Sequence, residues 1–231
     1  MSNSAKKEWR KTLATLTPTE EILINGRKLK IRPFNVKHLV ELRDADSREL
    51  PIKTLQAVSW CVFDKMSIDE LTAHDVELIT MTARKLSTPK LKHKYVCQCG
   101  KENTVSAYLN HVHIKENDLP SAFTLNQRLS LEMRKPTLIE FIHYEAGGEI
   151  GLANLVMRCV KSLTIDGTKQ VVGVDVELQE LGEMFEYLDV GTFRKMAEYV
   201  SDMPEMILPI PVVCECGNQD VHTLYGSEIF E

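Results

Sequence analysis

Two copies of a short cysteine pattern constrain this chain more than any other feature of its sequence. Residues 96–100 read VCQCG, and residues 213–217 read VCECG. Each copy places two thiols at the end of an apolar run, followed by a glycine that lets the backbone double back. Four of the six cysteines lie in these two segments. A fold for this chain therefore has to account for two pairs of thiols that are far apart in the sequence.

One structural zinc ion would account for both pairs. Structural zinc takes four ligands in a tetrahedron, commonly thiolates, and neither pair supplies four. Two cysteine turns, each presented by a hairpin, form the arrangement called a zinc ribbon. We therefore predict one shared Zn2+ that joins the two parts of the chain, with the ligands Cys97, Cys99, Cys214 and Cys216. Zinc ribbons usually have two residues between paired cysteines, and this chain has one, so the turn is tighter.

Other uses of these thiols remain open. The four cysteines could stay reduced as structural thiols, form an occasional disulfide, or hold an iron–sulfur cluster, which also takes thiolate ligands. A rival zinc site consists of Cys97 and Cys99 together with His111 and His113. That site would leave the second pair with only His222 close by in the sequence.

No pattern in the sequence indicates catalysis. Cys61 and Cys159 lie among apolar residues of expected helices, where cysteine behaves as a small hydrophobic residue. The histidines form no zinc-protease motif, and glycine is too scarce for a phosphate-binding loop. Gly147-Gly148 indicates a helix break, and the acidic segment 176–186 indicates a solvated helix face. We therefore expect a protein that is not an enzyme and has no small-molecule substrate.

The charge of the chain argues against a general nucleic-acid-binding surface. The net charge is −5 and the isoelectric point is about 5.9, whereas such surfaces carry a basic excess. No apolar run approaches the ~20 residues that span a bilayer, and the N-terminus lacks a signal-peptide pattern. We expect no membrane span and a reducing cytoplasm, where paired cysteines more often bind metal than form disulfides.

Local patterns predict an orderly series of elements in the first half. A hairpin turns at Asn25-Gly26, and Asn35 is expected to cap the helix that follows it. Pro51 suits the first turn of a second helix, and Thr72 is expected to cap a third. The expected helices span residues 36–45, 51–66 and 73–87, and strands at 91–96 and 104–109 flank the first cysteine pair.

The second half repeats this order. The segment LKIRPFNVKHLVEL from Leu29 aligns with LEMRKPTLIEFIHY from Leu131, so that Asn35 falls on Thr137. After a small gap, Cys61 falls on Cys159. The second half carries an extra hairpin with its turn at Asp166-Gly167 before its cysteine pair. A fixed order of matching elements is typical of a tandem duplication.

We therefore predict an α+β fold made of two related halves. Each half has a β-hairpin, a few helices and a Cys-x-Cys-Gly knuckle, and the halves join at the shared metal. The expected divisions are an N-terminal arm at 1–19, a first repeat at 20–115 and a second repeat at 116–231.

The order of segments in the first half resembles that of a viral protein family. The segment KIRPF at residues 30–34 leads directly into the helix from Val36 to Ala45. A helix around Cys61, a helix ending in RKLS at residues 84–87 and a strand with a cysteine knuckle follow. This order is similar to the baseplate hub subunits of T4-like contractile-tailed bacteriophages over about residues 20–110. The one-residue cysteine spacing departs from the wider knuckle of that family.

The resemblance implies a non-enzymatic structural or assembly component of the phage tail. The expected partners are other baseplate, hub, tail tube, spike or tape-measure proteins, with several copies of the chain around the tail axis. The expected location is the baseplate of the virion tail, after synthesis and assembly in the host cytoplasm. The residues also admit a zinc-ribbon adaptor or regulator that binds nucleic acid or a polymerase. Its support is a set of lysines near the first knuckle: Lys90, Lys92, Lys94 and Lys101.

Overall fold

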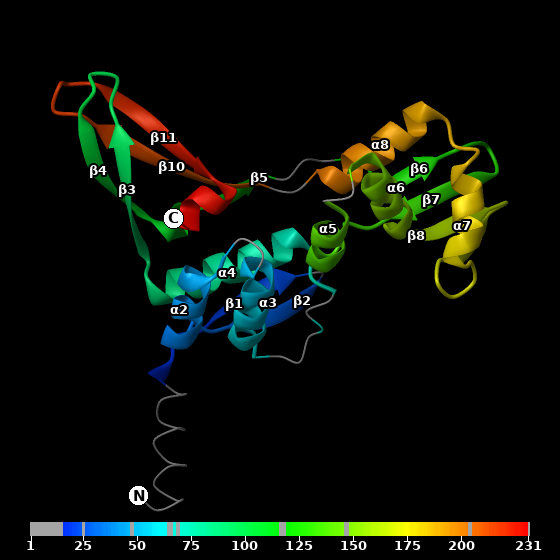
Figure 1. The fold of residues 1–231 in the computed structure, drawn as a ribbon, viewed down its shortest axis with the longest axis horizontal. Helices are drawn as coiled ribbons and strands as arrows, with labels where there is room; N and C mark the ends of the chain where they lie inside the picture. The colour runs from blue at the N-terminus through cyan, green and yellow to red at the C-terminus, as the bar shows by residue number, and fades with distance from the viewer. Residues whose placement is uncertain are drawn as a thin grey trace, which may run out of the picture. The chain divides into compact units, whose positions relative to one another are not determined.

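The protein is mixed α/β, and its contacts divide it into two compact units (Figure 1). The computed structural model describes residues 16–24, 26–46, 49–63, 67, 70–115, 119–145, 148–202 and 205–230. Unit 1 consists of Met1–Ile68, Asp75–Lys115 and Glu205–Glu231, and unit 2 of Asp69–His74 and Glu116–Pro204. Most of the predicted N-terminal arm lies outside the described residues.

Unit 1 begins with the predicted hairpin. Strands β1 (Glu20–Ile24) and β2 (Arg27–Ile31) pair antiparallel, with Glu20 opposite Ile31 and Ile24 opposite Arg27. The predicted turn residue Asn25 lies outside the described residues, and Gly26 has the positive φ of 75° that such a turn requires. The hairpin prediction is confirmed.

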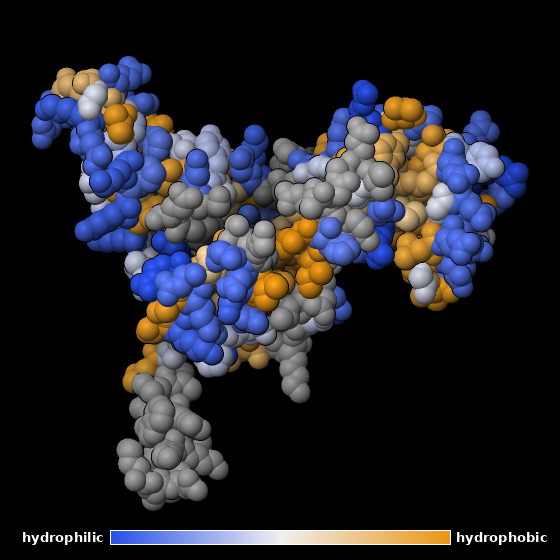
Figure 2. All heavy atoms as spheres, viewed as in Figure 1, coloured by the Kyte–Doolittle hydropathy of each residue, from blue (hydrophilic) through white to orange (hydrophobic). Residues whose placement is uncertain are grey.

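Three helices follow, as the sequence predicts: α2 (Val36–Asp44), α3 (Leu50–Cys61) and α4 (Ala73–Ser87). The side chain of Asn35 accepts a hydrogen bond from His38 N–H at 2.8 Å, which confirms the predicted N-cap of α2. Helix α3 ends earlier than the predicted 51–66, because Val62 is extended and bridges to Ile31. None of the residues of α2 is buried, and apolar side chains reach the surface in this part of unit 1 (Figure 2).

The cysteine knuckles lie at the tips of two antiparallel hairpins, both in unit 1. The first hairpin is β3 (Lys90–Val96) and β4 (Glu102–Tyr108), and the second is β10 (Glu205–Val213) and β11 (Gln219–Tyr225). The 3-10 helices η2 (Leu109–His111) and η3 (Gly226–Phe230) follow them. A short strand that the sequence did not predict, β5 (His113–Lys115), pairs with the start of β10.

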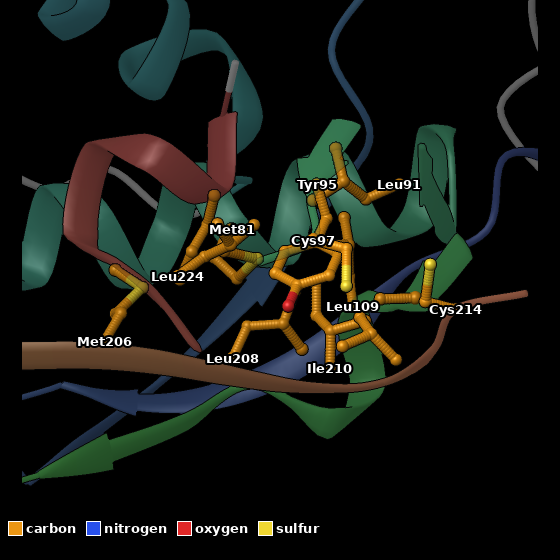
Figure 3. Close-up of a cluster of buried hydrophobic side chains, with 13 residues drawn as sticks. Met81, Leu91, Tyr95, Cys97, Leu109, Met206, Leu208, Ile210, Cys214 and Leu224 are labelled. Atoms are coloured by element: carbon orange, nitrogen blue, oxygen red, sulfur yellow. The ribbon is translucent and has the colours of Figure 1, made fainter. Parts of the chain in front are cut away.

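The two hairpins share one buried core (Figure 3). Alternate residues of β10 point inward, as the burial pattern of this strand shows. Leu91 and Tyr95 of β3, and Cys97 directly after that strand, are buried in the same core. The inward residues of β10 include Leu208 and Ile210, and Cys214, directly after the strand, is buried in the same core. Burying this apolar surface stabilises the pairing of hairpins that are far apart in the sequence.

Unit 2 is built on a four-stranded antiparallel sheet in the order β6-β7-β8-β9. Its strands are β6 (Ala122–Thr124), β7 (Leu129–Met133), β8 (Val160–Ile165) and β9 (Thr168–Val171). Its helices are α5 (Leu138–Glu145), α6 (Gly148–Arg158), α7 (Leu178–Phe185) and α8 (Val190–Ser201).

Several local predictions for unit 2 are confirmed. Asp166 and Gly167 both have positive φ, 48° and 80°, and join β8 to β9. Thr137 caps α5, because its Oγ1 accepts from Glu140 N–H at 3.2 Å while Glu140 accepts from Thr137 N–H at 2.9 Å. The glutamates of α7 are exposed, whereas Leu181 packs in the core of unit 2.

The chain leaves unit 1 and returns to it at neighbouring points. Lys115, the last residue of β5, pairs with Glu205, the first residue of β10. The second knuckle therefore belongs, by its contacts, to the same unit as the first. The predicted repeats at 20–115 and 116–231 are a statement that two stretches of sequence are similar. The division into units 1 and 2 rests on contacts and neither supports nor contradicts that similarity. Within the described residues, no helix is both long and apolar enough to cross a membrane.

Candidate metal centre

The two cysteine knuckles make the same backbone turn. In the first, Cys97 N–H donates to Lys101 O at 2.9 Å, and Gly100 N–H donates to Cys97 O at 2.8 Å. The second knuckle, at residues 214–218, makes the same two bonds at 2.9 Å each. The two knuckles therefore share one backbone hydrogen-bond pattern, and the two sulfurs of each pair lie within 4.8 Å of each other.

A glycine closes each turn. Gly100 has φ 82° and Gly217 has φ 87°, in the left-handed region that residues with a Cβ avoid. No atom outside the local backbone lies within 4 Å of a Cβ built at either position. The backbone conformation alone therefore requires glycine at these two places.

The structure brings all four predicted cysteines together. Their sulfurs lie within 4.8 Å of one another, with 3.8 Å between Cys97 and Cys216 and 3.7 Å between Cys99 and Cys214. Four bonds of about 2.3 Å to a tetrahedral ion would separate neighbouring sulfurs by about 3.8 Å. The spacing fits a four-thiolate metal site, and these cysteines could hold a metal ion.

Burial differs between the two members of each pair. Cys97 and Cys214 are buried at the end of the hydrophobic core, whereas Cys99 and Cys216 are exposed. Each knuckle thus supplies one ligand anchored by the core and one ligand at the surface, so the cluster is open to solvent on one side.

The four thiols interact electrostatically. The backbone N–H of Cys216 lowers the pKa of Cys214 to about 6, and that of Cys99 lowers the pKa of Cys97. The Asn218 N–H lowers the pKa of Cys216, but hydrogen bonds with Cys214 and Cys99 outweigh it and raise that pKa to about 11. Four thiolates this close repel one another, and a bound cation would relieve that repulsion.

Contacts across the cluster involve two asparagines that the sequence did not single out, and one ion pair. The side-chain amide of Asn103 lies 3.5 Å from Cys214 Sγ, and that of Asn218 lies 3.7 Å from Cys97 Sγ. Lys101 of the first knuckle forms an exposed ion pair with Glu215 of the second, at 2.9 Å. Asn218 directly follows the second Cys-x-Cys-Gly segment and Asn103 lies three residues after the first, so an amide within three residues of each glycine is the sequence signal that could have identified them.

The rival histidine ligands lie elsewhere. In the described part of the chain, the four cysteines form the one group of three or more metal-binding side chains, and His111 and His113 are outside it. His222 stacks on His93 of the facing hairpin, with their Nε2 atoms 3.2 Å apart.

Cys61 and Cys159 are buried structural thiols. Both are fully buried, and burial raises the pKa of each to about 12, so neither is a thiolate near neutral pH. Cys61 is the last residue of α3 and Cys159 directly follows α6, whereas the sequence predicted both within helices. The prediction that they act as small hydrophobic residues agrees with this burial.

Three of the four lysines near the first knuckle have partners. Lys94 pairs with Glu102 at 2.8 Å, Lys101 pairs with Glu215, and Lys90 lies 4.9 Å from the centre of the Tyr108 ring. Neutralisation of Lys94 and Lys101 by the two glutamates weakens the basic surface that nucleic-acid binding would require.

Comparison with known proteins identifies a family for almost the whole chain. A family model described as T4 bacteriophage base plate protein matches residues 15–230. No curated protein and no solved structure matches the chain.

Proposed function

Because this chain belongs to the T4 bacteriophage base plate protein family, we propose that it is a non-enzymatic structural or assembly component of the baseplate hub. The family assignment places the chain among the structural proteins of phage tails and implies association with other tail proteins. The hub position, next to the tail tube, spike and tape-measure proteins, is the finer part of the proposal. Its support is the order of segments from KIRPF to the first knuckle.

The structural role of the cysteine cluster is the second part of the proposal. A Zn2+ ion held by Cys97, Cys99, Cys214 and Cys216 would fix the tips of the two hairpins to each other. The observation that carries this assignment is the sulfur spacing of 3.7 and 3.8 Å between knuckles, which suits four zinc–thiolate bonds. The exposed Lys101–Glu215 pair alone would hold the tips only weakly.

The tandem duplication, with repeats at 20–115 and 116–231, is the third part. Matching hydrogen bonds support it. Arg32 N–H donates to Cys61 O at 2.9 Å, and Arg134 N–H donates to Cys159 O at 2.8 Å. The knuckle turns match in the same way. Superposition of 29–62 on 131–160 tests this proposal, which fails if α2 and α5 do not coincide.

Metal content tests the shared site. We expect one zinc per chain in the wild type, by mass spectrometry of the metal and of the intact protein under native conditions. The variants Cys97→Ser and Cys214→Ser should each lose most of that zinc, since each removes a ligand from the same ion. Cys61→Ser is the matched control, because this thiol is buried away from the cluster. A full equivalent of zinc in both single knuckle variants would contradict a shared site, and visible absorption by the purified protein would indicate an iron–sulfur cluster.

Location in the particle tests the hub assignment. Purified tails should contain the chain, and a tag on it should appear in electron micrographs at the tail axis, under the tube. A tag at the baseplate periphery would agree with a baseplate role and contradict the hub position. DNA binding that weakens steeply with salt would instead favour the nucleic-acid adaptor.

A further inference from the structure

Arg32 and Arg134 occupy equivalent local frames. Each follows a strand, β2 or β7, and precedes a helix, α2 or α5. The backbone N–H of each donates to the carbonyl of a buried cysteine at the end of another helix. Their side chains also reach matching carbonyls: Arg32 Nε donates to Trp60 O at 2.6 Å, and Arg134 Nη2 donates to Arg158 O at 3.1 Å.

The two frames differ in the residue at the third position of the helix. In unit 2 this residue is Glu140, whose two carboxylate oxygens each accept from Arg134 at 2.8 Å. In unit 1 the corresponding residue is His38, whose backbone N–H donates to the cap Asn35 just as that of Glu140 donates to Thr137. A histidine therefore stands in unit 1 where unit 2 has the acidic partner of the arginine.

Within the described residues, no carboxylate pairs with Arg32. Its guanidinium instead lies 3.8 Å from the centre of the Trp60 ring and 4.7 Å from that of Phe63. His38 cannot supply the missing negative charge, because an imidazole is either neutral or cationic. Burial lowers its pKa and so favours the neutral form, and its Nδ1 is buried without a hydrogen-bond partner in the described structure. Arg32 thus packs against two aromatic rings, and the side-chain hydrogen bond that it donates to Trp60 O comes from Nε and not from its Nη atoms.

The surroundings of Arg32 are exposed and apolar. Trp60 is 42% exposed and Phe63 is 46% exposed, although large aromatic side chains are usually buried. Helix α2 adds further exposed apolar residues: Val36, Leu39 and Val40. An arginine stacked on aromatic rings and surrounded by apolar side chains is a typical centre of a protein–protein interface.

We propose that the surface of Arg32, Trp60 and Phe63 binds a partner protein through one aspartate or glutamate side chain with apolar neighbours. The partner carboxylate would take the place that Glu140 holds beside Arg134, accepting two hydrogen bonds from the guanidinium. The apolar neighbours would cover Trp60, Phe63 and the exposed side of α2. The proposal rests on the proposed function for the class of partner, which is another protein of the phage tail.

The variant His38→Glu tests the proposal before the partner itself is identified. It places a carboxylate where Glu140 stands in unit 2, so Arg32 should be neutralised within its own chain. We expect the melting temperature to rise by about 2–4 °C. We also expect phage titre in a complementation assay to fall at least tenfold. His38→Gln is the matched control, since glutamine has the shape of glutamate without its charge. This variant should leave the titre unchanged.

A second variant covers the case in which the glutamate introduced by His38→Glu does not form an ion pair with Arg32. Arg32→Gln removes the guanidinium charge, and we expect the same loss of titre with the protein still folded and still carrying its zinc. In the phage, Arg32→Glu should be suppressed by replacement of an aspartate or glutamate with lysine or arginine in one other tail protein. That suppressor would identify the partner and its residue.

Three results would overturn the proposal. A wild-type titre for Arg32→Gln would show that no partner needs the guanidinium. A wild-type titre for His38→Glu together with a raised melting temperature would show the same. The third result concerns Asp64, which lies outside the described residues. If Asp64→Asn lowers the melting temperature of the wild type but not that of the Arg32→Gln variant, the chain supplies its own carboxylate to Arg32. Tails that assemble normally without the chain would instead refute the proposed function.

Discussion

The side-chain amide of Asn103, on β4, lies 3.5 Å from the sulfur of Cys214, at the tip of the opposite hairpin. The contact is nearly reciprocal, because Asn218 of the second knuckle lies 3.7 Å from the sulfur of Cys97. Each knuckle therefore donates toward the buried sulfur of the other. Hydrogen bonds of this kind stabilise thiolates and fix the orientation of metal ligands.

The first prediction concerns these amides. Asn103→Ala and Asn218→Ala should each keep one zinc per chain and weaken zinc binding about tenfold, the lower end of the usual effect of residues that support metal ligands. Competition with a chromophoric chelator measures this affinity. Asn110→Ala, at an exposed position of η2, is the control. Unchanged affinity in both knuckle variants would mean that the amides do not support the ligands.

The second prediction concerns removal of the metal. A strong chelator should lower the free energy of unfolding of unit 1 by several kcal/mol, less than the ~10 kcal/mol of small zinc peptides, because the shared hydrophobic core of the hairpins remains. Thermal unfolding with and without chelator measures the loss. A variant with serine at all four positions should not respond to the chelator, and an equal response would place the metal elsewhere.

The third prediction concerns the turns of the knuckles. Gly100→Ala and Gly217→Ala should each destabilise the protein by about 1–2 kcal/mol, since both glycines have a positive φ that alanine avoids. Gly182→Ala in α7 is the control, and there the added Cβ meets Met157 Sδ at an ordinary 3.7 Å. Alanine favours a helix over glycine, so this control should gain stability. Chemical unfolding curves compare the three, and a gain in the knuckle variants would contradict the turn geometry.

The fourth prediction concerns a charge network on the sheet of unit 2. Hydrogen bonds from Lys169 and Lys161 lower the pKa of Glu132 from 4.5 to about 2. The lowered pKa means that the network stabilises the folded state above about pH 4.5 and loses that contribution as the pH falls toward 2.

Glu132→Gln should therefore cost about 1 kcal/mol or less at pH 7, because the side chains are largely exposed. The difference from the wild type should shrink as the pH falls below 4.5. Urea unfolding of both proteins from pH 7 to pH 3 measures it, and their common cysteine cluster makes the same contribution to each. A difference that grows on acidification would contradict the assignment.

Local rules predicted the elements around the site well. The Asn35 cap, the Asp166-Gly167 turn and the strands flanking Cys97 and Cys99 all depend on residues close in sequence, and all are confirmed. The meeting of the two knuckles followed from a different argument, that four thiols are needed for one zinc. That argument depends on ligand chemistry and holds for any path of the chain between the knuckles.

Other features could not be predicted from local patterns. The pairing of β5 with β10 joins residues about ninety positions apart, and the three-residue strand has too few residues for an alternating pattern. The early end of α3 at Cys61 depends on the bridge from Val62 to Ile31, a contact with the first hairpin. The exposed setting of Trp60 and Phe63 depends on where α2 and β2 place Arg32, which composition does not reveal.

The pairing of Lys115 with Glu205 has a consequence for how such a chain can change. The segment between them leaves and re-enters unit 1 at adjacent backbone positions. The distance between its two ends is therefore the same whatever the length of the segment. Loop closure costs little more for a long insertion than for a short one. Descendants of this chain could therefore enlarge, shorten or replace the intervening segment and still align both cysteine hairpins in register.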